Sequence, residues 1–123
     1  MADLVERQLK ESKTIAVVGL SPNPDRDSNR VALYLQKVGY RVIPVNPMVE
    51  EVLGEKSYPD LKSIPADIEI DMVDVFRRSE LVEPVVDEAI ELGVKFIWMQ
   101  DGVIHDESAK KAEAVGIPVI MDN

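Results

Sequence analysis

The sequence predicts an α/β fold in which a mainly parallel sheet of five to six strands lies between two layers of helices. Three observations support this prediction. Apolar runs rich in β-branched residues recur along the chain, amphipathic segments separate them, and a glycine follows each of the main helical segments. Alternating strands and helices favour parallel strands joined by right-handed crossovers, which make a three-layer sandwich.

The expected strands are short and almost wholly apolar, as is typical of strands buried on both faces. They are Thr14–Val18, Arg41–Val45, Ile70–Val75, Lys95–Met99 and Ile117–Met121, with Glu51–Leu53 as a further short edge strand. We expect the second strand to lie beside the first, and the third, fourth and fifth long strands to be added on the other side of the first.

The expected helices each show an apolar stripe at helical spacing. They are Asp3–Glu11, Asn29–Val38, Glu80–Leu92 and Asp106–Val115, and Tyr58–Ile64 is expected to hold a single helical turn. Ser28 or Asp27 is the expected cap of the second helix, and Ser79 that of the third. The second helix is expected to face the core with Val31, Tyr34, Leu35 and Val38.

The length of 123 residues fits a single domain, 1–123, with residues 1–12 as a helix packed on it. The chain has no cysteine and one histidine, which excludes disulfides, thiolate catalysis and any Cys-based or multi-His metal site. A net charge of −9 disfavours nucleic acid as a partner. Because no apolar run is long enough to span a membrane and the first residues are unlike a signal peptide, we expect a cytoplasmic protein without a membrane partner.

The expected strand order places a topological switch point between Thr14–Val18 and Ile70–Val75. Open α/β sheets bind ligands at such a point, at the carboxyl ends of the strands. The bordering loops are Gly19–Asp27, Asn46–Met48 and Phe76–Ser79. Four of the six arginines fall in or beside two of these loops: Arg26, Arg30, Arg77 and Arg78.

The loop that opens with Gly19, Leu20, Ser21 and Pro22 joins a strand to a helix N-terminus, where backbone N–H groups and the helix dipole favour phosphate. An ordinary connection would use similar residues, but this one is longer than most. The loop lacks the second and third glycines of the dinucleotide fingerprint, and Pro44–Pro47 lacks the acidic residue that holds a ribose. NAD is therefore disfavoured.

Two further segments are candidates for the same site. Asn46 and Pro47 form a plain turn or shape a wall for an adenine. Arg77 and Arg78, directly after a buried strand, cap surface carboxylates or bind a pyrophosphate, and their position opposite the glycine loop favours the second role. Gln100 lies at the same sheet edge and is a candidate for contact with one arm of a ligand.

No catalytic or metal-binding residue is predicted. His105 is expected to begin a surface helix, because the sequence ties no Ser, Cys or carboxylate to it. Trp98 and Met99 are expected in the core or in an interface. Asp71 and Asp74 lie within a strand without a carboxylate at the end of the first strand to join them, which disfavours a magnesium-dependent receiver domain.

Four segments in combination resemble the small stand-alone CoA-binding proteins of bacteria and archaea. They are IAVVGLSPNPDRDSNRVALYLQKVGYRVIPVNP, EVLGEKSYPDL, DMVDVFRR and WMQDGV. These proteins share the Rossmann-like CoA-binding domain of the succinyl-CoA synthetase alpha subunit and of ADP-forming acyl-CoA synthetases. The resemblance covers about Thr14 to Asp122, and it is specific in combination although each motif alone is weak.

The resemblance implies coenzyme A or acyl-CoA as the ligand, bound without catalysis at the carboxyl edge of the sheet. Gly19–Pro22 and the following helix N-terminus would contact the phosphates, and Arg26 and Arg30 would be additional phosphate partners. Asn46 and Pro47 would border the nucleotide, and Val75, Phe76, Arg77 and Arg78 would line the opposite side. His105 matches no motif for the phosphorylated histidine of the synthetases.

Two alternatives remain open at this point. The domain could present CoA as the non-catalytic component of an acyl-CoA synthetase-type enzyme, or it could bind another adenine nucleotide such as NAD. A homodimer or an enzyme partner is compatible with either.

Overall fold

The computed structural model describes residues 2–123, with side chains from residue 4 onward. Its main sheet has five parallel strands in the order β2-β1-β5-β6-β7, as the sequence predicts. The strands are β1 (Thr14–Val18), β2 (Arg41–Val45), β5 (Met72–Val75), β6 (Phe96–Met99) and β7 (Val119–Ile120). The first two match their expected bounds, and the last three are shorter than expected.

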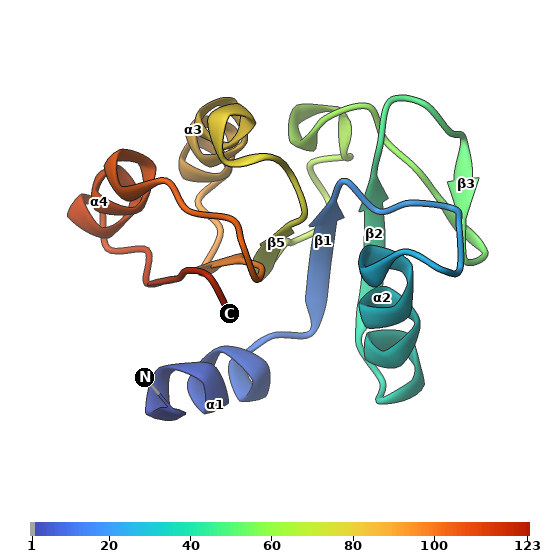
Figure 1. Cartoon of the computed structure of the whole chain (residues 1–123), viewed down its shortest axis with the longest axis horizontal. Coiled ribbons are helices and arrows are strands. Elements are labelled where there is room, and N and C mark those ends of the chain that lie inside the picture. Colours follow the sequence, from blue (N-terminus) through green and yellow to red (C-terminus); the bar gives the residue numbers. More distant parts are fainter. Residues whose placement is uncertain (1) are drawn as a thin grey trace.

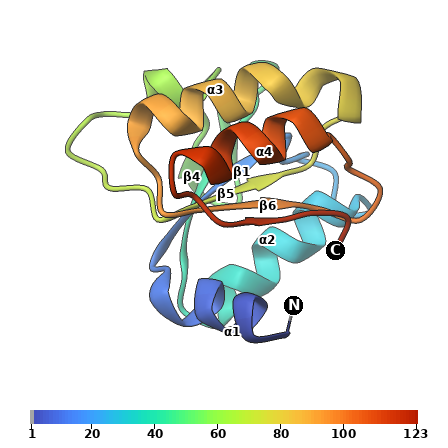
Figure 2. The same cartoon turned by 90° about the vertical axis from the view of Figure 1, so that its left-hand side faces the viewer.

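Helices cover both faces of this sheet, so the fold is a Rossmann-like three-layer sandwich. Figure 2 shows α3 (Val82–Leu92) and α4 (Asp106–Ala114) on one face, and α1 (Ala2–Glu11) and α2 (Asp27–Lys37) on the other. The buried side of α3 consists of Val82, Val85, Val86 and Ala89, with Ile90 half-buried, so its apolar stripe faces the sheet. None of the helices in the described part of the chain is long and apolar enough to cross a membrane.

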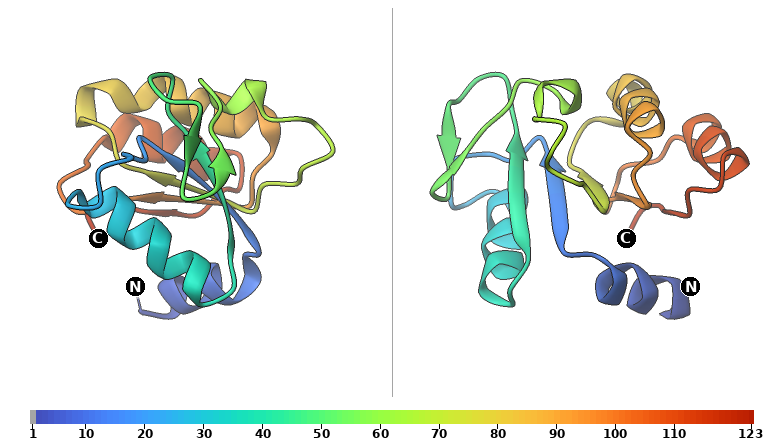
Figure 3. Two further views of the ribbon diagram at one scale, coloured as in Figure 1. Left: turned by 90° about the vertical axis from the view of Figure 1, so that its right-hand side faces the viewer. Right: turned by 180° about the vertical axis from the view of Figure 1, so that it is seen from behind.

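The region between β2 and β5 differs from the expectation. Glu51 does not join the main sheet: β3 (Glu51–Val52) and β4 (Glu55–Lys56) form a separate antiparallel hairpin beside β2 (Figures 1 and 3). Tyr58 is extended and forms a parallel bridge with Val45, and the helical turn begins only at Leu61 as a 3₁₀ helix, Leu61–Ser63. Asp60 caps that turn, since its Oδ1 accepts a hydrogen bond from the Ser63 amide at 2.8 Å.

The expected caps of two helices, Ser28 or Asp27 for α2 and Ser79 for α3, were wrong: Arg26 and Leu81 occupy the N-cap positions, and neither makes a side-chain hydrogen bond that caps its helix. α2 begins earlier than expected, at Asp27, so Ser28 lies inside its first turn. A 3₁₀ helix, Ser79–Leu81, precedes α3, and the Ser79 hydroxyl accepts a hydrogen bond from the Ile104 amide at 2.9 Å. Ser79 therefore connects the loop after β5 to the loop after β6 by a hydrogen bond.

The expected inner face of α2 is also wrong in part. Its buried residues are Ser28, Asn29, Ala32 and Leu35, whereas Tyr34 is 63% exposed and Val38 51% exposed. The helix is rotated so that small and polar side chains face the sheet. The two buried polar residues, Ser28 and Asn29, hydrogen-bond to the loop that precedes the helix.

Candidate functional site

Gly19 brings the loop after β1 against the loop after β5. Its φ is +87°, and a Cβ at this position would lie 2.1 Å from the Phe76 carbonyl oxygen. Its amide donates to the Val45 carbonyl at 2.9 Å, and the Phe76 amide donates to the Val18 carbonyl at 2.8 Å. Only a residue without a side chain allows the two loops to approach this closely.

The remainder of this first loop is held by its own polar groups. The Ser21 amide donates to Ser28 Oγ at 3.0 Å, and Asn29 Nδ2 donates to the Ser21 carbonyl at 2.9 Å. Ser21 Oγ accepts from the Asn23 amide at 3.1 Å, and Asn23 Oδ1 accepts from the Asp25 amide at 2.9 Å. These hydrogen bonds give the loop a defined shape before any ligand arrives, which lowers the entropy cost of binding.

Asn46 connects the loop after β2 to the same loop. Its Nδ2 donates to the Leu20 carbonyl at 2.9 Å, and its Oδ1 accepts from the Met48 amide at 2.9 Å. Pro47 follows with its ring exposed, whereas the Leu20 side chain is fully buried in the core. Asn46 therefore closes a turn and ties the loop after β2 to the loop after β1, and its role as a wall for an adenine stays a prediction.

Two hollows lie at the carboxyl edge of the sheet and share Gly19, Phe76, Arg77 and Arg78. The smaller one, about 310 Å³, is completed by Asn46, Pro47, Met48 and Leu81. The larger one, about 870 Å³, we call the arginine hollow; it is completed by Ser21, Asp25, Arg26, Asp27, Ser28, Arg30, Val31, Gln100, Asp101, Gly102 and Val103. The switch point thus gathers ten residues of the sequence-based set: Gly19, Ser21, Arg26, Arg30, Asn46, Pro47, Phe76, Arg77, Arg78 and Gln100.

Three members of that set line neither hollow. Leu20 and Val75 are fully buried in the core, so their side chains face away from both hollows. Pro22 is exposed on the outer side of the loop. Contact of these three residues with a ligand stays a prediction.

The arginines of the larger hollow differ in their pairing. Arg30 Nη2 forms an exposed ion pair with Asp27 Oδ1 at 2.8 Å. Among the described residues, Arg26, Arg77 and Arg78 make no ion pair, and Arg77 Nε is buried without a hydrogen-bond partner. A buried donor without a partner is uncommon in folded proteins, so Arg77 is a candidate to donate to an anion in the hollow.

The electrostatic balance of the arginine hollow departs from that of the whole chain. The hollow is lined by four arginines and by three aspartates, Asp25, Asp27 and Asp101, and all three aspartates are exposed. The chain as a whole carries −9. The first turn of α2 lines the same hollow and adds the positive end of its helix dipole. The arginine hollow is therefore electrostatically favourable for an anion of the size of a phosphate group.

Gln100 makes a contact that sequence reasoning missed. Its Nε2 donates to Asp74 Oδ1 at 2.6 Å, and Asp74 is only 2% exposed. Burial raises the pKa of Asp74 to about 7, against which the Gln100 hydrogen bond acts only in part. The strand register pairs Asp74 with Trp98, two residues before Gln100, so alternation along the strands placed both side chains on one face and could have revealed the pair.

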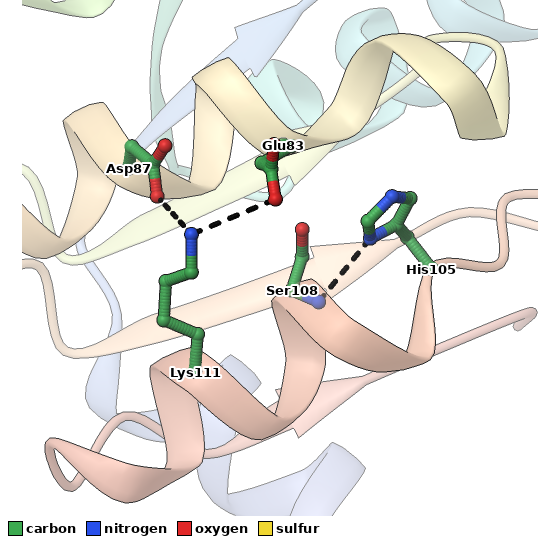
Figure 4. A network of polar contacts seen from close by, with 5 residues as sticks. All are labelled: Glu83, Asp87, His105, Ser108 and Lys111. Carbon is green, nitrogen blue, oxygen red and sulfur yellow. Dashed lines mark hydrogen bonds and ion pairs between the residues drawn. The ribbon is translucent and has the colours of Figure 1, made fainter.

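His105 begins α4, as expected. Its Nδ1 accepts a hydrogen bond from the Ser108 amide at 3.2 Å and so caps the helix (Figure 4). On the same helix, Lys111 Nζ lies 2.8 Å from Asp87 Oδ1 and 3.7 Å from Glu83 Oε2, which ties α4 to α3 (Figure 4). These contacts hold the helical layer together and lie outside the two hollows.

Trp98 and Met99, at the end of β6, separate into two environments. Met99 is fully buried in the core, whereas Trp98 is half-buried on the other face of the strand. Trp98 Nε1 donates to the Asn123 carbonyl at 3.1 Å. Met99 therefore fills the core as expected, and Trp98 keeps part of its ring accessible.

The strand order and the arginine-lined hollow at its switch point define a Rossmann-like α/β domain with a site suited to a phosphate-bearing ligand. The chain belongs to the CoA binding domain family, whose model matches residues 13–123.

Known proteins of two kinds are similar to this chain. The uncharacterized protein YneT of Bacillus subtilis (strain 168) is 44% identical over 118 residues, which cover 96% of this chain and 86% of YneT. A solved structure of a hypothetical protein from Pyrococcus horikoshii OT3 has a TM-score of 0.94 and 40% identity, and the match covers 100% of this chain and 85% of that one. Both are of similar length to this chain.

The second kind is much longer. ADP-forming acetate–CoA ligase II of Archaeoglobus fulgidus is 28% identical over 109 residues, which cover 87% of this chain but only 16% of the ligase. This chain is therefore related to one region of that ligase, and most of the ligase has no counterpart in it.

Proposed function

We propose that the protein binds coenzyme A or an acyl-CoA at the carboxyl edge of its sheet and catalyses no reaction of its own. The observation that carries this proposal is the arginine hollow: four of the six arginines of an acidic chain and the N-terminus of α2 line one space at the switch point. Coenzyme A is strongly anionic and matches this distribution of charge. Membership of the CoA binding domain family supports the same ligand.

In the proposed complex the phosphates lie against Arg26, Arg30, Arg77 and Arg78 and the first turn of α2. The smaller hollow, with Asn46, Pro47 and Met48 on its wall, receives the adenine. Gly19, Leu20, Ser21 and Pro22 border the ligand along the loop after β1, Val75 lies behind it at the end of β5, and Phe76 and Gln100 flank it. The whole chain, 1–123, acts as a single cytoplasmic binding domain in this proposal.

Titration calorimetry with CoA tests the role of the two adjacent arginines. The double variant Arg77→Ala with Arg78→Ala is expected to weaken binding more than about tenfold, since hydrogen bonds to charged groups contribute roughly 1.5–3 kcal/mol. The matched control is Arg7→Ala with Arg41→Ala, which also removes two arginines but far from both hollows. Unchanged affinity in the Arg77/Arg78 variant would contradict the proposed site.

A thermal-shift panel tests the identity of the ligand. A ligand that binds only the native state stabilises it by RT ln(1 + [L]/Kd), so millimolar CoA is expected to raise the melting temperature. Dephospho-CoA, NAD and ATP at equal concentration are expected to give smaller shifts. A larger shift with NAD than with CoA would favour the alternative that the domain binds another adenine nucleotide. The absence of a shift with CoA would count against the proposal.

A second candidate function is presentation of CoA to a separate catalytic subunit. The similarity to one region of an ADP-forming acetate–CoA ligase favours this candidate. It predicts that a ligase-type subunit co-purifies with the chain and that CoA-dependent acyl transfer needs both proteins. Acyl transfer by either protein alone would rule it out.

A further inference from the structure

A third hollow lies beside the arginine hollow, lined by residues of α1, α2 and the strands that they cover. Figure 2 shows the face of the sheet on which α1 and α2 lie. The volume of the third hollow is about 170 Å³. α1 contributes Leu9 to its wall, α2 contributes Val31 and Leu35, and Met72 and Trp98 form its floor. We call it the apolar hollow, because these hydrophobic side chains make up most of its lining.

The apolar hollow and the arginine hollow share two residues. Val31 and Gln100 line both of them, so the two spaces meet at these side chains. A ligand whose phosphates lie in the arginine hollow therefore has an apolar space next to it, and the side-chain amide of Gln100 lies between the two spaces. Such a sequence of anionic, polar and apolar surroundings matches the order of groups along an acyl-CoA, from its phosphates through its amide-containing arm and thioester to its acyl chain.

The size of the apolar hollow limits the chain that it can hold. An apolar protein cavity of about 150 Å³ is known to take up benzene, a molecule of six carbon atoms. The apolar hollow, at about 170 Å³, is therefore matched to a chain of about the same number of carbons.

We propose that the apolar hollow receives the acyl group of a short-chain acyl-CoA, with the thioester beside Gln100. This inference rests on the proposed binding of CoA and adds a ligand preference to it. Asp74, hydrogen-bonded to Gln100 on the same floor, is compatible with an alkyl neighbour, because burial raises its pKa to about 7 and so favours the uncharged acid.

Trp98 gives a direct readout, since it is the only tryptophan of the chain and lies on the floor of the apolar hollow. Butyryl-CoA is expected to change the Trp98 emission spectrum, whereas CoA without an acyl group is expected to leave it unchanged. Calorimetry is expected to show roughly fifteenfold tighter binding of butyryl-CoA than of acetyl-CoA, because two further methylenes are buried and each contributes about fourfold. The gain is expected to end at about six carbons.

A filling variant locates the effect. Leu9→Phe is expected to abolish the advantage of butyryl-CoA over CoA while CoA itself binds as before, because Leu9 lines the apolar hollow and not the arginine hollow. Leu92→Phe, at an exposed leucine of α3 on the opposite face of the sheet, is the matched control and is expected to retain the advantage.

The outcomes separate this inference from the proposal on which it rests. Equal affinity for CoA, acetyl-CoA and butyryl-CoA, with no change in Trp98 emission, would overturn the acyl site and leave CoA binding intact. Failure of CoA itself to bind would overturn the proposed function. If Leu9→Phe does not fold, the chain-length series on the unaltered protein decides the question by itself.

Discussion

Two buried aspartates three positions apart show how differently the two edges of the sheet handle charge. Asp71, at the amino edge, accepts hydrogen bonds from the amides of Lys13 and Thr14 at 2.8 and 3.0 Å and forms an ion pair with Lys95 at 3.3 Å. Asp74, toward the carboxyl edge, has Gln100 as its hydrogen-bond partner and no ion pair among the described residues. Both residues are buried, at 6% and 2% exposure.

The pKa values of the two groups move in opposite directions. Burial by itself would raise the pKa of Asp71, but the two backbone donors and Lys95 together lower it. Burial raises the pKa of Asp74 to about 7 because a single neutral hydrogen bond does not compensate for it. The charge of Asp71 at the amino edge therefore stabilises the fold. The carboxyl edge has a buried carboxyl group that costs stability and three arginines, Arg26, Arg77 and Arg78, that make no ion pair among the described residues, as is common at functional sites.

The largest effect is expected for Asp74→Asn. The unfolded chain ionises Asp74 near pH 4 and the folded chain only near pH 7, so the folded state binds more protons in between and its stability falls as the pH rises through this range. The cost is complete above about pH 7. Asn keeps an oxygen acceptor for Gln100 but has no charge.

Urea unfolding at pH 8 is therefore expected to show that Asp74→Asn raises the free energy of unfolding by at most about 4 kcal/mol, at about 1.36 kcal/mol for each unit of pKa shift. The gain is expected to be nearly absent at pH 4, because this pH is close to the pKa of Asp74 in the unfolded chain and far below its pKa in the folded chain. A gain that is the same at pH 4 and pH 8 would show that the buried charge is not its cause.

The second prediction concerns the stability of the variant Gly19→Ala, at the carboxyl edge of the sheet. Gly19 at the carboxyl edge and Gly116 just before the last strand both have a φ of +87°, but only at Gly19 would a Cβ meet a backbone atom, the Phe76 carbonyl oxygen at 2.1 Å. Gly19→Ala is expected to cost about 3 kcal/mol of unfolding free energy, from left-handed backbone strain and crowding together.

Gly116→Ala is the matched control, and it is expected to cost about 1 kcal/mol from the strain alone. The difference between the two variants measures the contact between the loops that follow β1 and β5. Equal costs would mean that the loops separate easily and that the switch point is not rigidly built.

The same contrast explains what the sequence could predict. Runs such as Thr14–Val18 and Arg41–Val45 are so apolar that burial on both faces is their only stable arrangement, and their order follows from right-handed crossovers. Crossover topology also brought Gly19 and Arg77 together, although they lie far apart in the chain.

The sequence-based predictions failed where the position of a side chain depends on a specific polar partner. Periodicity assigned Tyr34 and Val38 to the inner face of α2, but Ser28 and Asn29 face inward instead because both hydrogen-bond to Ser21. Hydrophobic periodicity contains no information on such bonds. The Asp74–Gln100 pair was missed for the same reason, since a carboxylate in an apolar strand gives no sign of its donor until the register is known.

An effect smaller than those of Asp74→Asn and Gly19→Ala is expected for Asp71→Asn, at the amino edge. The amide oxygen of Asn still accepts from the Lys13 and Thr14 amides, so the variant loses the charge on those hydrogen bonds and the attraction to Lys95. Because the pKa of Asp71 is lowered in the folded protein, its charged carboxylate stabilises the fold above the usual pKa of 3.8, and this stabilisation is lost as the pH falls below that value. The free energy of unfolding of the variant is therefore expected to be lower by roughly 1–2 kcal/mol at pH 7. The deficit is expected to shrink as the pH falls below 3.8, the opposite profile to that of Asp74→Asn. Urea unfolding at pH 3 and pH 7 measures it, with Asp67→Asn at an exposed loop position as the matched control. If Asp71→Asn stabilised the protein at pH 7, both buried aspartates would be costs, and the two edges would not differ in the way that their hydrogen bonds indicate.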